Sequence, residues 1–131
     1  MPPWVEVLAF FVNDKGSAAA HNTVFGDNGP TDVITLSYDP MPGMNTGRIG
    51  ELIINVDRAV TEGDKRKRPR NWSIAHELAL YLAHGVDHLT GATDDTPPGR
   101  RRMRAREMNW VRSAERRGLL QDLMQEGSPV V

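Results

Sequence analysis

The segment His84–Asp94 reads HGVDHLTGATD, and it decides how the rest of the chain is organised. It continues an apolar run that begins at Trp72 and has the spacing of a largely buried helix. His84 and His88 are four residues apart, so a helix projects both imidazoles from one face, one turn apart. Gly91 can end this helix in a left-handed conformation and turn the chain back.

This turn can bring Asp94 to the same point in space as the two histidines. Two nitrogens and one carboxylate oxygen would form a zinc site whose fourth position is open to water, which is the catalytic rather than the structural pattern. The alternative is an ordinary helix surface followed by a helix stop, because histidines at this spacing also occur without a metal. The glycine, the following acid and the apolar helix favour the metal site.

The same letters nearly spell the metalloprotease pattern H-E-x-x-H-x-x-G-x-x-H/D. Where a protease carries its general-base glutamate, this chain has Gly85. Asp87 is the nearest acid, but it is displaced around the helix from that role. A metalloprotease is therefore the remotest of the functions considered.

The length of 131 residues suits a single domain over residues 1–131. Since the chain has no cysteine, we expect no disulfide partner, and any metal must bind His, Asp or Glu. The apolar patch 5–12 is too short for a membrane span, contains Glu6 and lacks the basic start of a secretory signal. We expect a cytoplasmic protein with no membrane partner.

The net charge of −1 hides an asymmetry between the two halves of the chain. Residues 1–64 hold three cations and nine acids, a net charge of −6, whereas residues 65–131 hold thirteen cations and eight acids, a net charge of +5. A basic half can attract a polyanion, although a charge run is more often a solvated surface. The candidate phosphate contacts are Arg66, Arg68, Arg70, Arg100, Arg101 and Arg102.

Hydrophobic patterning predicts an α/β (α+β) domain. Strands are predicted over 5–12, 31–38 and 50–56. Helices are predicted over 17–25, around 57–60, from 72 into the histidine motif, and over 100–117. We expect a mixed sheet of about three to four strands packed by helices, with the metal site at the end of a buried helix.

Composition rich in Gly, Pro, Asn and Asp predicts the connections between these elements. They are expected at 13–16, 39–47, 61–70 and 95–99. Asn71 or Ser73 should cap the histidine helix. In the last helix, Met103, Met108, Trp110 and Val111 should face inward and the arginines outward. Residues 118–131 contain one more possible turn and then fray.

Three blocks occur in the order seen in one known family: TDVITLSYD (31–39), GELIINVDRA (50–59) and HGVDHLTGATDD (84–95). They resemble the bacterial YbeY family, whose hallmark is HGxLHLxGYDH after a TDVLSFP strand and a GDIxI strand. The resemblance covers roughly residues 8–115. It implies a compact α/β domain, a zinc ion held by three histidines, and hydrolysis of single-stranded RNA during ribosomal RNA maturation.

On this chain His84 and His88 match the first two family ligands. The third falls on Asp94, where a carboxylate oxygen is a chemically permitted zinc ligand. The chain departs from the hallmark at Ala92-Thr93, which replaces Tyr-Asp, and at Asp87, which replaces leucine.

Two further departures lie earlier in the chain. A family arginine, thought to contact RNA, is missing after Phe25, where the chain continues with Gly26. Family members also usually carry an extra strand and helix ahead of the segment that matches Val5, so the start is short relative to the family.

The leading hypothesis is a zinc-dependent, single-strand-specific endoribonuclease that acts in ribosomal RNA maturation. His84 and His88 would act through a water activated by the metal, and the partners would be precursor ribosomal RNA and the ribosome. The second hypothesis is a catalytically impaired family member that binds RNA or the ribosome. The metalloprotease remains a third.

Overall fold

The structure is a computed structural model, and it describes residues 4–40, 42–43, 47–67, 71–92 and 95–123. Within these ranges the sheet consists of β1 (Trp4–Val12), β2 (Val33–Tyr38) and β3 (Arg48–Asn55). The strand order is β1-β3-β2, with β1 parallel and β2 antiparallel to β3. The predicted mixed sheet and its strands are confirmed, with ends shifted by one or two residues.

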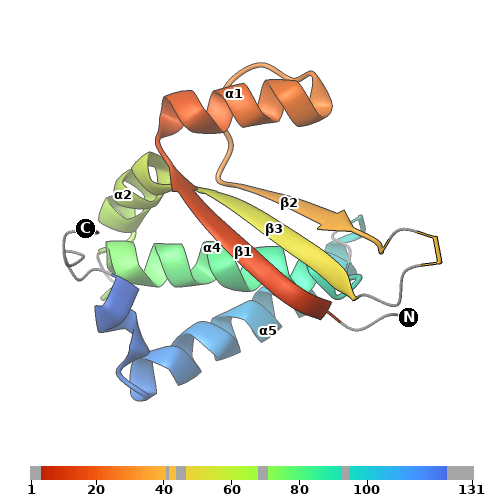
Figure 1. Cartoon of the computed structure of the whole chain (residues 1–131). Helices are drawn as coiled ribbons and strands as arrows, with labels where there is room; N and C mark the ends of the chain where they lie inside the picture. Colours follow the sequence, from red (N-terminus) through yellow and green to blue (C-terminus); the bar gives the residue numbers. More distant parts are fainter. Residues whose placement is uncertain (1–3, 41, 44–46, 68–70, 93–94, 124–131) are drawn as a thin grey trace, which may run out of the picture.

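The described helices are α1 (Asp14–Phe25), α2 (Val56–Lys65), α4 (Ile74–Leu89), α5 (Pro97–Arg116) and the short 3-10 helix η1 (Leu119–Leu123). Figure 1 shows α4 running along one face of the sheet, with α5 on the far side of α4. The molecule therefore has three layers, and α4 is the middle one. No helix in the described part of the chain is both long and apolar enough to span a bilayer.

Helix α4 is apolar on two sides, which is why it lies in the middle. Toward the sheet, Leu78 packs with Leu52 and Ile54 of β3. Toward α5, Leu80 packs with Val111. Burying each such aliphatic side chain contributes roughly 1.5–3 kcal/mol to folding. The buried helix predicted to carry the histidines is thus confirmed, and Ser73 rather than Asn71 caps it.

Three predicted loops are partly helical. Helix α1 begins at Asp14 because the side chain of Asn13 accepts a hydrogen bond from the Gly16 amide at 2.8 Å. Helix α2 continues to Lys65. Helix α5 begins at Pro97, where Thr96 is the N-cap and proline suits the first turn.

The predicted inner face of α5 is correct in part. Met103 and Val111 are buried, and Met108 packs against the core. Trp110 is 40% exposed, so its inward assignment was wrong. Not all the arginines of α5 face outward: the Arg106 guanidinium turns toward Asp87 of α4, and that of Arg112 lies over the buried Trp72 ring.

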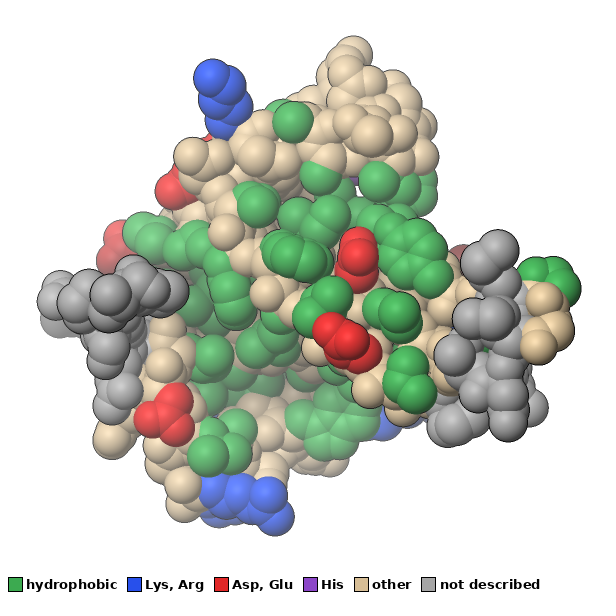
Figure 2. All heavy atoms as spheres, viewed as in Figure 1, with side chains coloured by type: hydrophobic (Ala, Val, Ile, Leu, Met, Phe, Trp, Pro, Cys, Tyr) green, Lys and Arg blue, Asp and Glu red, His purple; other side chains and the backbone are tan. Residues whose placement is uncertain are grey.

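Apolar side chains remain exposed on β1, one of the two edge strands of the described sheet. Figure 2 shows hydrophobic side chains gathered over this strand and its surroundings. Val5, Val7, Phe10 and Phe11 are each between 46% and 62% exposed. Helix α4 covers β2 and β3 and leaves this edge open.

A buried polar network joins three elements at the end of β3. Asn55, fully buried, donates through Nδ2 to Asp14 Oδ1 at 2.8 Å and to the Thr31 carbonyl at 3.1 Å. Its amide donates to the Asp32 carbonyl at 2.9 Å, and its Oδ1 accepts from the Arg58 amide at the start of α2. The network fixes the entry of β2, and with it Asp32.

Candidate functional site

The two histidines of α4 meet at one point. Their Nε2 atoms lie 3.1 Å apart. His88 donates from Nδ1 to the Ala92 carbonyl at 3.2 Å. His84 Nδ1 lies 3.1 and 3.2 Å from the two carboxyl oxygens of Glu107. Since each Nδ1 is engaged, the two Nε2 atoms are the positions left to bind a ligand.

This arrangement fits a metal ion. Two nitrogens held tetrahedrally at about 2.0–2.1 Å from zinc lie about 3.3 Å apart, close to the separation seen between His84 and His88. A carboxylate or carbonyl on the other ring nitrogen is the usual outer partner of a metal-binding histidine. Two facing nitrogen lone pairs would otherwise repel each other, so a cation or proton between them is required.

The chain turns back over His88 as the sequence indicated. Gly91 has a φ of 95°, in the left-handed region, and the Ala92 amide donates to the Asp87 carbonyl at 3.2 Å. Asp94, the predicted third ligand, lies outside the described residues. Among the described residues, no third His, Cys, Asp or Glu completes a metal-binding group with the histidines.

Sequence reasoning missed Glu107, which α5 places against His84. Glu107 is only 4% exposed. Burial, together with a hydrogen bond to Asp87 and the charge of that residue, raises the pKa of Glu107 to about 8. A cation held by His84 would favour the ionised form. The only sequence signal was an isolated acid within an arginine-rich helix.

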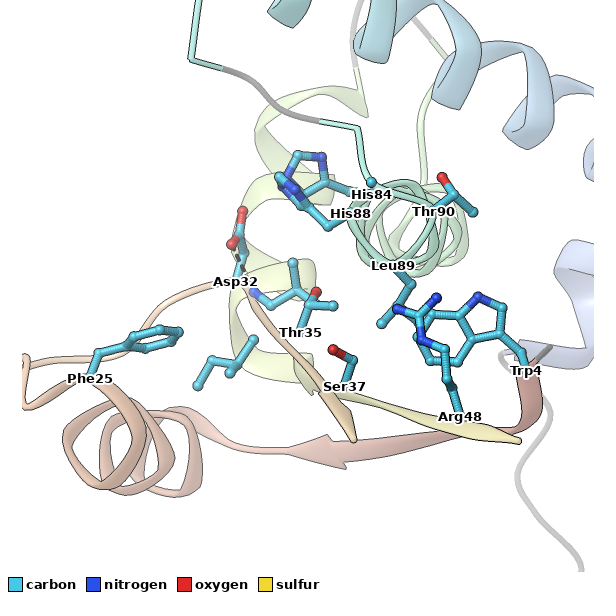
Figure 3. A pocket seen from close by; sticks show the side chains of 13 residues that line it. Trp4, Phe25, Asp32, Thr35, Ser37, Arg48, His84, His88, Leu89 and Thr90 are labelled. Atoms are coloured by element: carbon cyan, nitrogen blue, oxygen red, sulfur yellow. Dashed lines mark hydrogen bonds between the residues drawn. The ribbon is translucent and has the colours of Figure 1, made fainter. Parts of the chain in front are cut away.

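A cavity of about 710 Å³ opens in front of the histidines. In Figure 3, Asp32 at the entry of β2 points toward them, and Phe25 lies at one end of the cavity. At the other end the Arg48 guanidinium stacks over the Trp4 ring, 3.8 Å from its centroid. Asp32 is oriented by the Val33 amide, which donates to its Oδ1 at 2.7 Å.

Asp32 was also missed as a site residue, although it belongs to the TDV block. The predicted arginines are placed in part. Arg66 pairs with the buried Glu77 at 2.7 Å instead of projecting from a free loop. Arg68 and Arg70 lie outside the described residues. The three arginines of the first turns of α5 are exposed: Arg100, Arg101 and Arg102.

The sequence model of one family, described as Endoribonuclease YbeY, matches residues 1–115. The chain belongs to the YbeY family. It is 33% identical over 104 residues to the Endoribonuclease YbeY of Chlamydia felis, covering 78% of this chain and 65% of that protein. It is 30% identical over 124 residues to that of an Anaeromyxobacter species, covering 95% and 60%. The chain thus spans less than two thirds of the length of these curated relatives.

The YbeY hallmark has leucine where this chain has Asp87, and the structure shows how the change is accommodated. Asp87 is fully buried, and its Oδ1 accepts from Arg106 Nε at 2.9 Å and from Arg106 Nη2 at 2.7 Å. Arg106 thus binds one oxygen of the carboxylate, while Oδ2 is buried and has no hydrogen-bond partner among the described residues.

Gly85 in the YbeY motif marks the contact between α4 and the sheet. A Cβ atom added there would lie 2.6 Å from Cδ2 of the buried Leu52. A glutamate at this position would collide with the core.

Proposed function

We propose that this chain is a zinc-dependent endoribonuclease that cleaves single-stranded RNA during ribosomal RNA maturation. The observation that carries the proposal is the pair of Nε2 atoms 3.1 Å apart, facing an open cavity with both rings held at Nδ1. The names of the relatives support the RNA substrate. Asp94 is proposed as the third metal ligand.

Each residue of the site has a separate proposed role. Bound zinc supplies Lewis-acid chemistry to a phosphodiester and to water. His84 and His88 would hold the metal through Nε2, and Glu107 and the Ala92 carbonyl keep the two rings in the orientation that presents these atoms. Asp32 points toward the histidines, so its carboxylate would accept a hydrogen bond from an attacking water.

The cavity suits an unpaired strand. Phe25 is 57% exposed and offers a ring on which one base can stack, which requires a base free of its own duplex. The exposed arginines at the start of α5 would supply phosphate contacts, together with Arg68 and Arg70, whereas Arg66 already pairs with Glu77. The ribosome is the proposed setting, in the cytoplasm.

A catalytically impaired, RNA-binding member is the second candidate. The observation that favours it is the absence of the family arginine after Phe25, which removes one charged contact to the phosphate. Loss of a donor to the transition state costs about 2–4 kcal/mol. Slow cleavage is therefore expected of this chain.

The test is metal content followed by RNA cleavage. Protein purified without added zinc should carry about one zinc per chain, and His84→Ala and His88→Ala should lose it. Cleavage of single-stranded RNA should disappear with chelator and in His84→Ala. His21→Ala removes a histidine of α1 that contacts the Gly29 carbonyl and does not line the cavity. It is the matched control for metal content and should keep the zinc; its ring packs against Phe25, so it is not used as a control for cleavage. Cleavage that survives both treatments would indicate a contaminating nuclease and favour the second candidate.

The third ligand has its own test. Asp94→Ala should weaken zinc binding strongly, because an open three-ligand site would keep only two arms. Asp94→His restores the family triad, so we expect equal or tighter binding. Competition with a chromophoric zinc chelator measures both. Unchanged affinity in Asp94→Ala would remove Asp94 from the site.

A further inference from the structure

A second cavity lies along α4 next to the cavity in front of the histidines. It encloses about 360 Å³ between α2, α4 and α5, and both Asp32 and His84 line it as well as the first cavity. Glu77, Tyr81 and His84 form its α4 wall, and His88 continues the same helix face into the first cavity. The two cavities therefore meet at Asp32 and His84.

The charges that line the second cavity balance each other. Its guanidinium groups belong to Arg58, Arg66 and Arg104, and its carboxyl groups to Asp32, Glu62, Glu77 and Glu107. Arg66 pairs with Glu77 at 2.7 Å, and Arg58 lies 4.0 Å from Glu62. Because four carboxyl groups face three guanidinium groups, the cavity has no excess of positive charge that would attract a phosphate. It suits a neutral ligand that both donates and accepts hydrogen bonds.

Glu77 provides the clearest acceptor. It is fully buried, and its Oε1 accepts from Arg66 at 2.7 Å and from Trp72 Nε1 at 2.8 Å. Its Oε2 has no donor within hydrogen-bond distance among the described residues, and the nearby Tyr81 phenol, whose pKa is raised by burial and by the Glu77 carboxylate, lines the same cavity. A buried carboxylate oxygen without a donor is costly, so a ligand that brings an N–H group here would be stabilised.

We propose that this cavity binds one nucleobase of the RNA, and that guanine fits it best. The proposal rests on the proposed function, since the same strand must cross the histidines. Glu77 lies seven residues before His84, about 10 Å along the helix, which leaves room for one nucleotide beyond the phosphate at the metal site. Guanine offers N–H donors to a carboxylate and the O6 and N7 acceptors that arginine recognises. Uracil lacks the amino group.

Binding to metal-free protein tests the base preference without cleavage. Fluorescence anisotropy in the presence of chelator would compare a nine-residue oligouridine with the same RNA carrying one central guanine. The guanine should tighten binding about tenfold, in the range of one recognised base. Replacing it with inosine, which lacks the 2-amino group, should lose much of this gain.

Variants locate the effect. Arg104→Ser and Arg58→Ser, at the cavity wall, should abolish the preference for guanine. Arg116→Ser removes the same charge from an exposed position of the same helix, outside the cavity, and should retain the preference. Equal affinity for both RNAs in the wild-type protein would overturn the proposal, as would a preference that both cavity variants keep. Displacement of both RNAs alike by inorganic phosphate, without any guanine preference, would identify an anion site instead.

Cleavage of the same two RNAs by zinc-loaded protein separates the two proposals. Cleavage without a guanine preference in binding would leave the proposed function standing and remove the base site. A guanine preference without cleavage would support RNA binding at this cavity and count against the enzyme.

Discussion

Asp87 shows how one residue of the helix is tied to the candidate site. A buried carboxylate is stable only when its charge is compensated, and Arg106 provides two hydrogen bonds to Asp87. Glu107, which follows Arg106 in the chain, contacts His84. The pair therefore lies directly behind a proposed metal ligand, and it replaces the apolar contact that the family leucine implies.

Removing one member of this pair should cost more than removing both. Arg106→Leu leaves the Asp87 charge buried without a partner, and we expect a loss of about 2 kcal/mol in the free energy of unfolding, moderated because Arg106 is 41% exposed. The double variant Asp87→Leu, Arg106→Leu should recover most of it. Urea denaturation of the wild-type protein and these two variants measures the loss and its recovery. A double variant as unstable as the single one would show that the pair is not the source of the cost.

At the scale of elements, Asn55 holds the end of β3, the start of α2 and the entry of β2 together. Asn55→Ala removes a helix cap and two hydrogen bonds donated by a fully buried amide. The expected loss is about 2–3 kcal/mol, since a cap contributes about 1 kcal/mol and each hydrogen bond a net of about 0.5–1.5 kcal/mol. Asn109→Ala, exposed on α5, is the control and should change stability little. Thermal unfolding of both variants measures the loss, and an Asn55→Ala variant as stable as the control would show that the network does not stabilise the fold.

Gly85 lies where α4 contacts Leu52 of β3. Gly85→Ala gains about 1 kcal/mol of helix propensity but places a methyl group 2.6 Å from Leu52 Cδ2. Overpacking in a core costs about 1–3 kcal/mol, so we expect net destabilisation. Adding Leu52→Val should relieve part of the strain, and chemical denaturation of both variants measures it. A stabilised single variant would show that the helix can shift away from the sheet.

The acidic half of the chain (residues 1–64) and the basic half (residues 65–131) both line the cavity in front of the histidines. The basic half places exposed arginines at the start of α5, next to the histidine helix. If they neutralise phosphates, RNA affinity must fall with salt, because each contact releases counterions.

Replacing Arg100, Arg101 and Arg102 with Ser should therefore flatten the dependence of log K on log salt by about 0.7 for each real contact with a single strand. The same test applied to Arg66, Arg68 and Arg70 weighs the other basic segment. Filter-binding titrations over a range of salt concentrations give both slopes. If a triple variant leaves the slope unchanged, the arginines it replaces do not contact phosphates and belong to ordinary solvated surface.

The local elements of this fold could be predicted from the sequence, because they depend on neighbours in the chain. The apolar run over residues 52–54 marked β3, the four-residue spacing placed His84 and His88 on one helix face, and Gly91 marked the turn that follows. Helix starts at Asp14 and Pro97 were missed, since a cap overrode the loop-like composition there.

The surroundings of the histidines required the tertiary structure. Glu107 reaches His84 only because α5 packs on α4, and Asp32 faces the same point only because β2 crosses the other side of that helix. Arg66 finds Glu77 across the junction of α2 and α4. Spacing along the chain encodes which residues share a face of one helix or strand. Which faces meet depends on how the apolar sides of distant segments pack, and that packing also determines which polar groups are buried together.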